Sequence, residues 1–184
     1  MISRRHVVTD SAIAVVAEQG VRGLTHRAVD ALAELPVGST SNVYRTRDAL
    51  VTGIMERIGE LNTQQLERLP DMFHGSGKPA QDIAVDFCMS WLTTDRNRFY
   101  TMIMLSLDPA LPGEAVAAKQ KNMHKIDEFV MRLAKVDAET ARTINSSVMG
   151  MMVAELIAGT ADRPHIESFM EQFLAWLGTA ATPA

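Results

Sequence analysis

The chain has 184 residues, of which 47% are hydrophobic and 22% are charged, and its formal net charge is −4. This composition excludes a wholly disordered chain, because disorder needs fewer apolar residues and a larger net charge. The single cysteine, Cys88, excludes an internal disulfide framework and a zinc site built from several cysteines. No apolar run reaches the roughly 18 residues of a membrane-spanning helix. We find no targeting sequence and therefore expect a cytoplasmic protein.

Apolar residues repeat at helical spacing through the first seventy residues, which predicts four helices in this part of the chain. Gly20 is expected to stop the first helix, and Thr25 and Thr46 to cap the second and the fourth. Pro36 is expected to occupy the first turn of the third. The four helices are expected at about 3–19, 26–32, 36–44 and 47–69. Short helices joined by tight turns within fifty residues suggest a helix-turn-helix unit.

The remaining residues predict a larger helical body. Residues 70–78 include Pro70, Gly75 and Gly77 and predict a loop. Five further helices are expected at about 79–94, 96–107, 114–135, 138–159 and 164–177. The first two of these are apolar nearly all round, as buried helices are. No β-type alternation stands out, so we predict an all-α fold of about nine helices.

Charge and methionine are unevenly distributed between the two parts. Residues 1–52 hold six Arg, no Lys and five acidic residues, so the acidic excess lies in the rest of the chain. Eight of the twelve Met fall between residues 89 and 152. We expect a boundary after residue 46, with a first domain at 1–46 and a second at 47–184 that begins with a connecting helix at 47–69.

One motif spans both the predicted second and third helices. A helix end at Gly20, the cap Thr25 and the inward residue Val29 precede the run A-E-L-P-V-G-S-T-S-N-V-Y-R-T-R-D-A-L over residues 33–50. This pattern resembles the DNA-binding domain of the tetracycline-repressor (TetR) family, whose usual run is A-G-V-S-x-G-T-L-Y-x-H-F-x-S-K-x-x-L. The positions in register are Gly38, Ser39 for Thr, Tyr44 for Phe, Thr46 for Ser, Arg47 for Lys, and Leu50. The chain departs from that run at Glu34, Ser41 and Val43, where the family has Gly, Tyr and His.

The resemblance implies that the first domain binds double-stranded DNA. Major-groove recognition needs short polar side chains on an exposed helix, with cations beside the phosphates. Asn42 is the expected base reader, because a carboxamide can pair bidentately with adenine. Arg4 and Arg5 could reach the adjacent groove as an arm. The expected DNA-binding residues are Thr25, His26, Arg27, Gly38, Ser39, Thr40, Ser41, Asn42, Tyr44, Arg45 and Arg47.

The resemblance also implies a ligand-binding and dimerisation body. Met and aromatic side chains at helical spacing could line a pocket, although plain core packing remains the alternative for each. The expected pocket residues are Cys88, Met89, Trp91, Phe99, Tyr100, Met102, Met123, His124, Phe129 and Met152. Small residues every four positions would let a second helix approach closely, so two faces could form a homodimer. The expected dimer residues are Ser146, Gly150, Ala154, Ala158, Ile166, Phe169, Met170 and Phe173.

These features favour a DNA-binding transcription regulator. The resemblance implies a repressor that a small apolar or amphipathic effector releases from a palindromic operator. The alternative is a helical protein-interaction module, or a regulator-like protein without operator binding. We expect no enzymatic activity, metal or cofactor, because the five His are scattered and no phosphate-binding glycine loop or metal-ligand spacing occurs.

Overall fold

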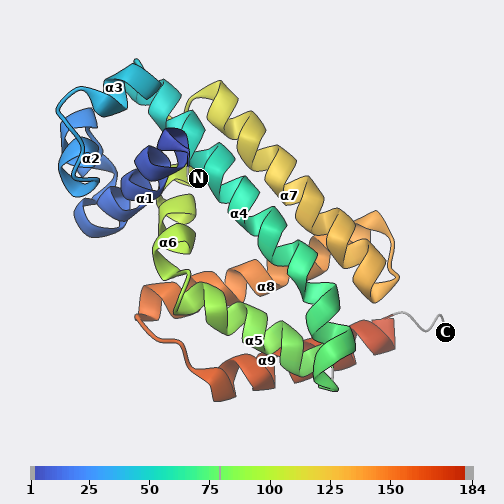
Figure 1. Ribbon diagram of the computed structural model, residues 1–184. Helices are drawn as coiled ribbons and strands as arrows, with labels where there is room; N and C mark the ends of the chain where they lie inside the picture. The colour runs from blue at the N-terminus through green and yellow to red at the C-terminus, as the bar shows by residue number, and fades with distance from the viewer. Residues whose placement is uncertain (1–2, 79, 181–184) are drawn as a thin grey trace. The chain divides into compact units, whose positions relative to one another are not determined.

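The computed structural model describes residues 3–78 and 80–180, without the side chains of residues 70–76, 80 and 177–180. The described residues form nine α-helices and no strand (Figure 1), which confirms the predicted all-α fold. The helices are α1 (Arg4–Gly23), α2 (His26–Leu32), α3 (Ser39–Val43), α4 (Arg47–Ser76), α5 (Ala80–Leu92), α6 (Arg96–Ser106), α7 (Gly113–Ala134), α8 (Ala138–Ala158) and α9 (Arg163–Ala180). In the described part of the chain, no helix combines the length and the apolar character needed to cross a membrane.

The helices form two compact units. The first consists of Met1–Leu66 and Asn97–Phe129, and the second of Glu67–Arg96 and Val130–Ala184. The expected boundary after residue 46 therefore lies inside the first unit. The assignment of different functions to residues 1–46 and 47–184 stays a prediction.

The core of the first unit begins on α1. Val8, Ala12, Val15 and Val16 recur along one face and are fully buried. The hydroxyl of Thr101 on α6 donates a hydrogen bond of 3.0 Å to the carbonyl of Ile13, which joins α6 to this face.

The predicted helix ends are partly right. Gly20 has a φ of 72° and breaks the regular helix, and the chain resumes helical geometry only as far as Gly23. Thr25 accepts a hydrogen bond from the backbone amide of Ala28, and Thr46 accepts one from that of Ala49, both at 3.1 Å. These contacts confirm both threonine caps.

The third and fourth helices differ from the prediction. Helix α3 begins only at Ser39. Pro36 lies in the turn before it, where the Pro36 carbonyl accepts a hydrogen bond from the Ser39 amide. Helix α4 continues to Ser76, so the predicted loop at 70–78 was wrong for most of its length. Leu69, the expected last residue, is buried, and the helix continues beyond it for seven more residues. Gly77, with a φ of 63°, then provides the left-handed residue at which helices commonly stop.

In the second unit, α5 packs against α8 and α9. Its side of the core includes the buried residues Ile83, Val85, Cys88, Trp91 and Leu92. Helix α8 starts where the Asp137 carboxylate accepts the amide of Thr140 at 2.8 Å and ends at Gly159, which has a φ of 71°. Both ends agree with the predicted helix at 138–159.

Candidate nucleic-acid interface

A buried carboxylate holds the turn between α2 and α3. Asp30, on α2, is only 2% exposed and accepts hydrogen bonds from the backbone amides of Gly38 and Thr40, each at 2.7 Å. It also accepts one from the Thr40 hydroxyl at 2.6 Å. Burial by itself raises the pKa of Asp30, but these hydrogen bonds outweigh it and hold the pKa below its ordinary value. The charged carboxylate therefore fixes the start of α3 on α2.

The other end of α3 is held by Tyr44. Its carbonyl oxygen lies 2.7 Å from Nε2 of His26, at the start of α2. Its ring packs against Gly53 of α4, where an added Cβ would lie 2.4 Å from ring atoms. The guanidinium of Arg5 lies 4.9 Å from the ring centroid, at a cation–π distance. Helix α3 is thus anchored to α1, α2 and α4.

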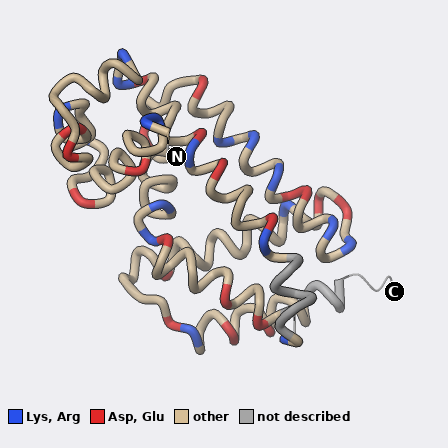
Figure 2. The backbone as a smooth tube through the Cα atoms, viewed as in Figure 1, with Lys and Arg blue, Asp and Glu red and all other residues tan. Residues whose placement is uncertain are grey.

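This anchoring leaves two polar side chains of α3 exposed, those of Ser41 and Asn42. The Ser41 hydroxyl donates to the Gly38 carbonyl at 2.9 Å, whereas the Asn42 carboxamide has no hydrogen-bond partner among the described residues. Arg27 and Arg45 are exposed on either side of α3 in the sequence. Arg47 is also exposed and donates to the Val21 carbonyl at 3.2 Å. Figure 2 shows basic segments, with acidic ones among them, along the part of the chain that forms α2, α3 and the start of α4.

Burial corrects the expected role of three residues in this region. Thr40 is fully buried, and Ser39 and Tyr44 are 6% and 5% exposed. A side chain enclosed in this way cannot reach a DNA base or phosphate, so these three position α3 instead. His26, half-buried against Tyr44, is also part of the support. Thr25 and Arg27 remain exposed.

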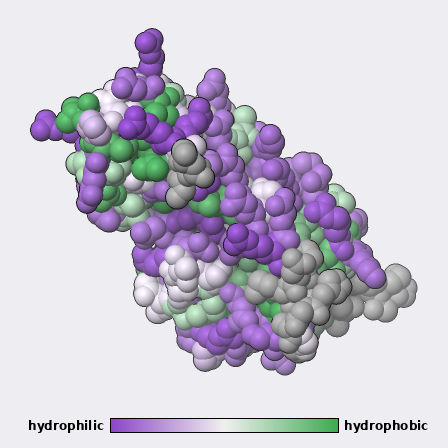
Figure 3. Space-filling view, in the orientation of Figure 1, coloured by the Kyte–Doolittle hydropathy of each residue, from purple (hydrophilic) through white to green (hydrophobic). Residues whose placement is uncertain are grey.

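Sequence reasoning missed Asp30 and Val37. Asp30 could have been found as the lone acid in α2, eight residues before a glycine that opens the next helix. Val37 is 87% exposed in the turn before α3, and Leu32 is 40% exposed at the end of α2. Hydrophobic surface is visible at this end of the first unit (Figure 3). Glu34, where the resembled motif has Gly, adopts the left-handed φ of 52° that glycine takes most easily.

The ten expected effector residues are divided between the two units. Phe99, Tyr100, Met102, Met123, His124 and Phe129 belong to the first, and Cys88, Met89, Trp91 and Met152 to the second. Five are buried, namely Cys88, Trp91, Phe99, Met102 and Met152. Burial raises the pKa of the Cys88 thiol to about 12, which suits a packed side chain and not a reactive one.

His124 is the one expected pocket residue that the structure places on the outside. Its side chain is 76% exposed and lies 3.4 Å from the carboxylate of Glu128, one turn along α7. The imidazole therefore does not serve as a polar anchor in an interior pocket. For the other nine residues, contact with a ligand stays a prediction.

The expected dimer residues also separate into two groups. Ser146, Gly150, Ala154 and Ala158 form an exposed ridge on α8, and Ile157 beside them is 81% exposed. Ile166 and Met170 are buried within the second unit, where α9 packs on α5. These two residues therefore belong to the core of the unit and not to a dimer surface, which corrects the prediction. Phe169 and Phe173 are half-buried, with stacked rings 5.6 Å apart.

Comparison with known proteins supports the fold. No family model and no curated protein sequence matches the chain. Among solved structures, a TetR family member from Streptomyces coelicolor A3 (SCO1917) has a TM-score of 0.72 at 23% identity over 93% of this chain and 98% of its own. A transcriptional regulator from Rhodococcus sp. Rha1 has a TM-score of 0.80 at 14% identity, over 98% and 100% of the two chains.

A third solved structure is the multidrug binding protein EbrR complexed with imidazole, with a TM-score of 0.70 at 22% identity over 94% of this chain and 95% of its own. The fold of the described residues is therefore that of TetR-type transcriptional regulators. This confirms, at the level of fold, the resemblance carried by Gly20, Thr25, Val29 and residues 33–50.

Proposed function

We propose that the chain is a transcription regulator that binds double-stranded DNA through α3. The observation that carries this proposal is the set of hydrogen bonds between Asp30 and Thr40, which fixes a short helix with Ser41 and Asn42 exposed. A rigid support of this kind reduces the ordering cost of presenting polar side chains to a groove. Arg27, Arg45 and Arg47 surround that helix with cations suited to phosphates.

In this proposal the residues divide into readers and backbone contacts. Asn42 pairs with a base edge in the major groove, and Ser41 donates to a base or a phosphate. Arg27, Arg45 and Arg47 contact phosphates, together with the exposed hydroxyl of Thr25. The backbone at Gly38 can approach DNA closely. Thr40 and Tyr44 hold this surface in place from behind.

We also propose that the protein acts as a homodimer on a palindromic site. Two reading helices about 34–36 Å apart would double the contacts on successive major grooves. The exposed ridge of Ser146, Gly150, Ala154 and Ala158 on α8 supports this, because small side chains permit close helix contact and Ile157 adds apolar area.

The proposed effector is a small apolar or amphipathic molecule, and its binding releases a repressor from DNA. Structures of EbrR with imidazole, proflavin, malachite green and ethidium make small aromatic compounds reasonable first candidates.

The test is a band-shift titration with the DNA upstream of the protein's own coding region, at several salt concentrations. Asn42→Ala should weaken binding to the specific site by about tenfold or more and leave non-specific binding nearly unchanged. Arg47→Ala should weaken both and reduce the salt dependence by about one counterion. Arg132→Ala, at an exposed position on α7, is the control and should change neither. Equal losses on all DNA would remove Asn42 from the reading role.

The competing function is a helical protein-interaction module, or a regulator-like protein without operator binding. The exposed apolar residues Val37 and Leu32 beside α3 are the observation in its favour. In that case the wild-type chain would bind the upstream DNA no better than unrelated DNA of equal length. The same titration therefore separates the two functions.

A further inference from the structure

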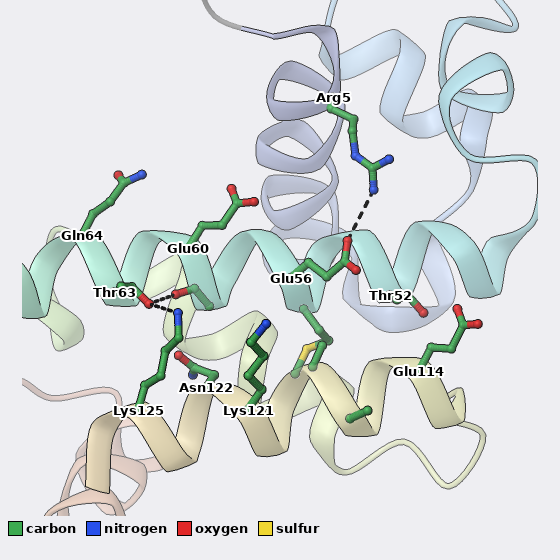
Figure 4. A pocket seen from close by; sticks show the side chains of 14 residues that line it. Arg5, Thr52, Glu56, Glu60, Thr63, Gln64, Glu114, Lys121, Asn122 and Lys125 are labelled. Atoms are coloured by element: carbon green, nitrogen blue, oxygen red, sulfur yellow. Dashed lines mark hydrogen bonds and ion pairs between the residues drawn. The ribbon is translucent and has the colours of Figure 1, made fainter. Parts of the chain in front are cut away.

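A groove runs between α4 and α7 in the first unit, on the side that faces Arg5 of α1 (Figure 4). Its volume is about 910 Å³, which is in the range of small-molecule sites. Its lining includes Met55 and Gly59 of α4 and Asn122 of α7. None of the residues expected to bind an effector lines it.

Two buried polar atoms of the groove lining have no hydrogen-bond partner among the residues that the structure describes. They are Oδ1 of Asn122, a residue only 5% exposed, and Oγ1 of Thr52, a residue only 9% exposed. A buried acceptor without a donor destabilises the folded state, so such atoms commonly mark the place of a missing donor. The missing partner of Asn122 Oδ1 must be an N–H or O–H group, because a carboxamide oxygen only accepts.

The charges around the groove balance, with three basic and three acidic side chains among the lining residues. Glu56 is engaged by Arg5 at 3.3 Å, and Glu60 by Arg57 at the same distance. Lys125 donates to the Thr63 hydroxyl at 3.2 Å. A hydroxyl leaves the Lys125 charge unbalanced, so Glu114, Lys121 and Lys125 have no ion-pair partner among the described residues. One acid and two bases favour a ligand that carries both signs of charge, and the nearest opposite charges along α7 are Glu114 and Lys121.

The spacing of these two groups limits the length of the zwitterion. Glu114 and Lys121 are seven residues apart on α7, which corresponds to about 10 Å along a helix. Figure 4 shows Glu114 near Thr52 at one end of the groove, with Lys121 and Lys125 toward the other. An extended peptide of three residues spans about 10 Å, whereas the charges of a single amino acid lie much closer together.

We propose that this groove binds a short zwitterionic peptide of about three residues. The peptide carboxylate pairs with Lys121 and Lys125, and its terminal ammonium pairs with Glu114. A peptide N–H donates to Oδ1 of Asn122, and a peptide carbonyl accepts from Thr52.

Isothermal titration of the full chain with trialanine tests the proposal. We expect saturable binding at one site, lost with N-acetyl-trialanine and with trialanine amide, which each lack one terminal charge. Lys121→Gln and Glu114→Gln should each weaken binding about tenfold, because each removes a charge-assisted contact. Lys119→Gln, on the same helix but outside the groove lining, is the matched control and should bind as the wild type does.

Asn122→Ala should also weaken binding, and its circular dichroism spectrum would show whether the buried substitution disturbs folding. Lys121→Gln and Glu114→Gln change exposed side chains, so they still test the proposal if Asn122→Ala does not fold. Absence of saturable trialanine binding, equal binding of the capped peptides, or unchanged binding by Lys121→Gln would each overturn the proposal. The assay contains no DNA, so its outcome does not depend on the proposed DNA-binding function.

Discussion

The carboxylate of Asp30 accepts two hydrogen bonds from Thr40, one from the backbone amide at 2.7 Å and one from the hydroxyl at 2.6 Å. Both residues are buried, so these bonds are shielded from water. The Gly38 amide donates a third hydrogen bond to the same carboxylate. Together the three bonds fix the start of α3 to α2.

Asp30→Asn should therefore loosen α3 without changing its exposed surface. The substitution removes the negative charge and turns a donor group toward backbone amides. We expect a loss of about 1–3 kcal/mol in the free energy of unfolding, measured by urea denaturation. We also expect weaker DNA binding although no contact residue is altered. Thr40→Val should cost less, because two amide hydrogen bonds remain. If Asp30→Asn unfolds at the wild-type urea concentration, the contact does not stabilise the domain.

Two glycines of α4 should respond in opposite directions to alanine. A Cβ at Gly53 would lie 2.4 Å from atoms of the Tyr44 ring, so Gly53→Ala must displace that ring. We expect a loss of about 1–3 kcal/mol in unfolding free energy. A Cβ at Gly59 would lie 3.6 Å from Asn122, an ordinary contact, so Gly59→Ala should gain up to about 1 kcal/mol from helix propensity. Thermal melts of both variants check the contrast, and a shift of the same sign in both would contradict it.

The connection between α8 and α9 should make stability depend on acid pH through Glu155. Its carboxylate accepts the Asp162 amide at 3.0 Å and the Thr160 hydroxyl at 2.7 Å, and lies 2.6 Å from Nδ1 of His165. These hydrogen bonds lower the pKa of Glu155 against the opposing effect of burial. A lowered pKa gives stability that is complete above the ordinary value of 4.5 and is lost as the pH falls through the folded-state pKa.

Glu155→Gln isolates this contribution. The variant should be less stable than the wild type by about 1–3 kcal/mol at neutral pH, since an acceptor is replaced by a donor on one side. The difference should shrink as the pH falls below 4.5, where the wild-type carboxyl takes up its proton. Urea denaturation of both proteins across that range measures the difference. Glu139→Gln, at an exposed position on α8, is the control. A difference that is constant with pH would show that charge at Glu155 contributes nothing.

A substitution on the α8 ridge should dissociate the proposed homodimer. Ala154 is exposed among small side chains, and Ala154→Arg would hold two α8 helices apart. We expect a dimer in sedimentation equilibrium for the wild type and a monomer for the variant at the same micromolar concentration. Ala134→Arg, at the exposed end of α7, should leave the dimer intact. A wild-type monomer would remove the dimer from the proposal.

Much of the fold could be predicted from local signals. The spacing of apolar residues indicated most of the helices, and the caps at Thr25 and Thr46 were placed correctly because an N-cap depends only on residues within one turn. Pro36 misled the prediction of α3, since proline favours a turn as readily as a first helical turn. Pro70 and the glycines near it suggested a loop, although the apolar stripe continued to Leu69 and the helix to Ser76.

The sequence predicted which residue types form the candidate site, but it did not predict which of their side chains are exposed. Ser39, Thr40, Ser41 and Asn42 are all short and polar, and nothing local to the sequence distinguishes those that face outward. The structure separates them, because the Asp30 carboxylate draws Thr40 inward and leaves Ser41 and Asn42 at the surface. Nothing in the sequence indicated the polar groove between α4 and α7 either, since its lining comes from three segments that lie at least 47 residues apart.

Composition and charge first described an acidic, methionine-rich chain with one cysteine. Local sequence alone accounts for the helices, their threonine caps and the TetR-like motif, because each depends on neighbours within a few residues. Only the tertiary structure decided that Thr40 and Tyr44 are buried, that His124 is exposed and that Ile166 faces the core. Burial results from contacts between segments distant in sequence, and a periodic pattern marks an apolar face without naming what covers it.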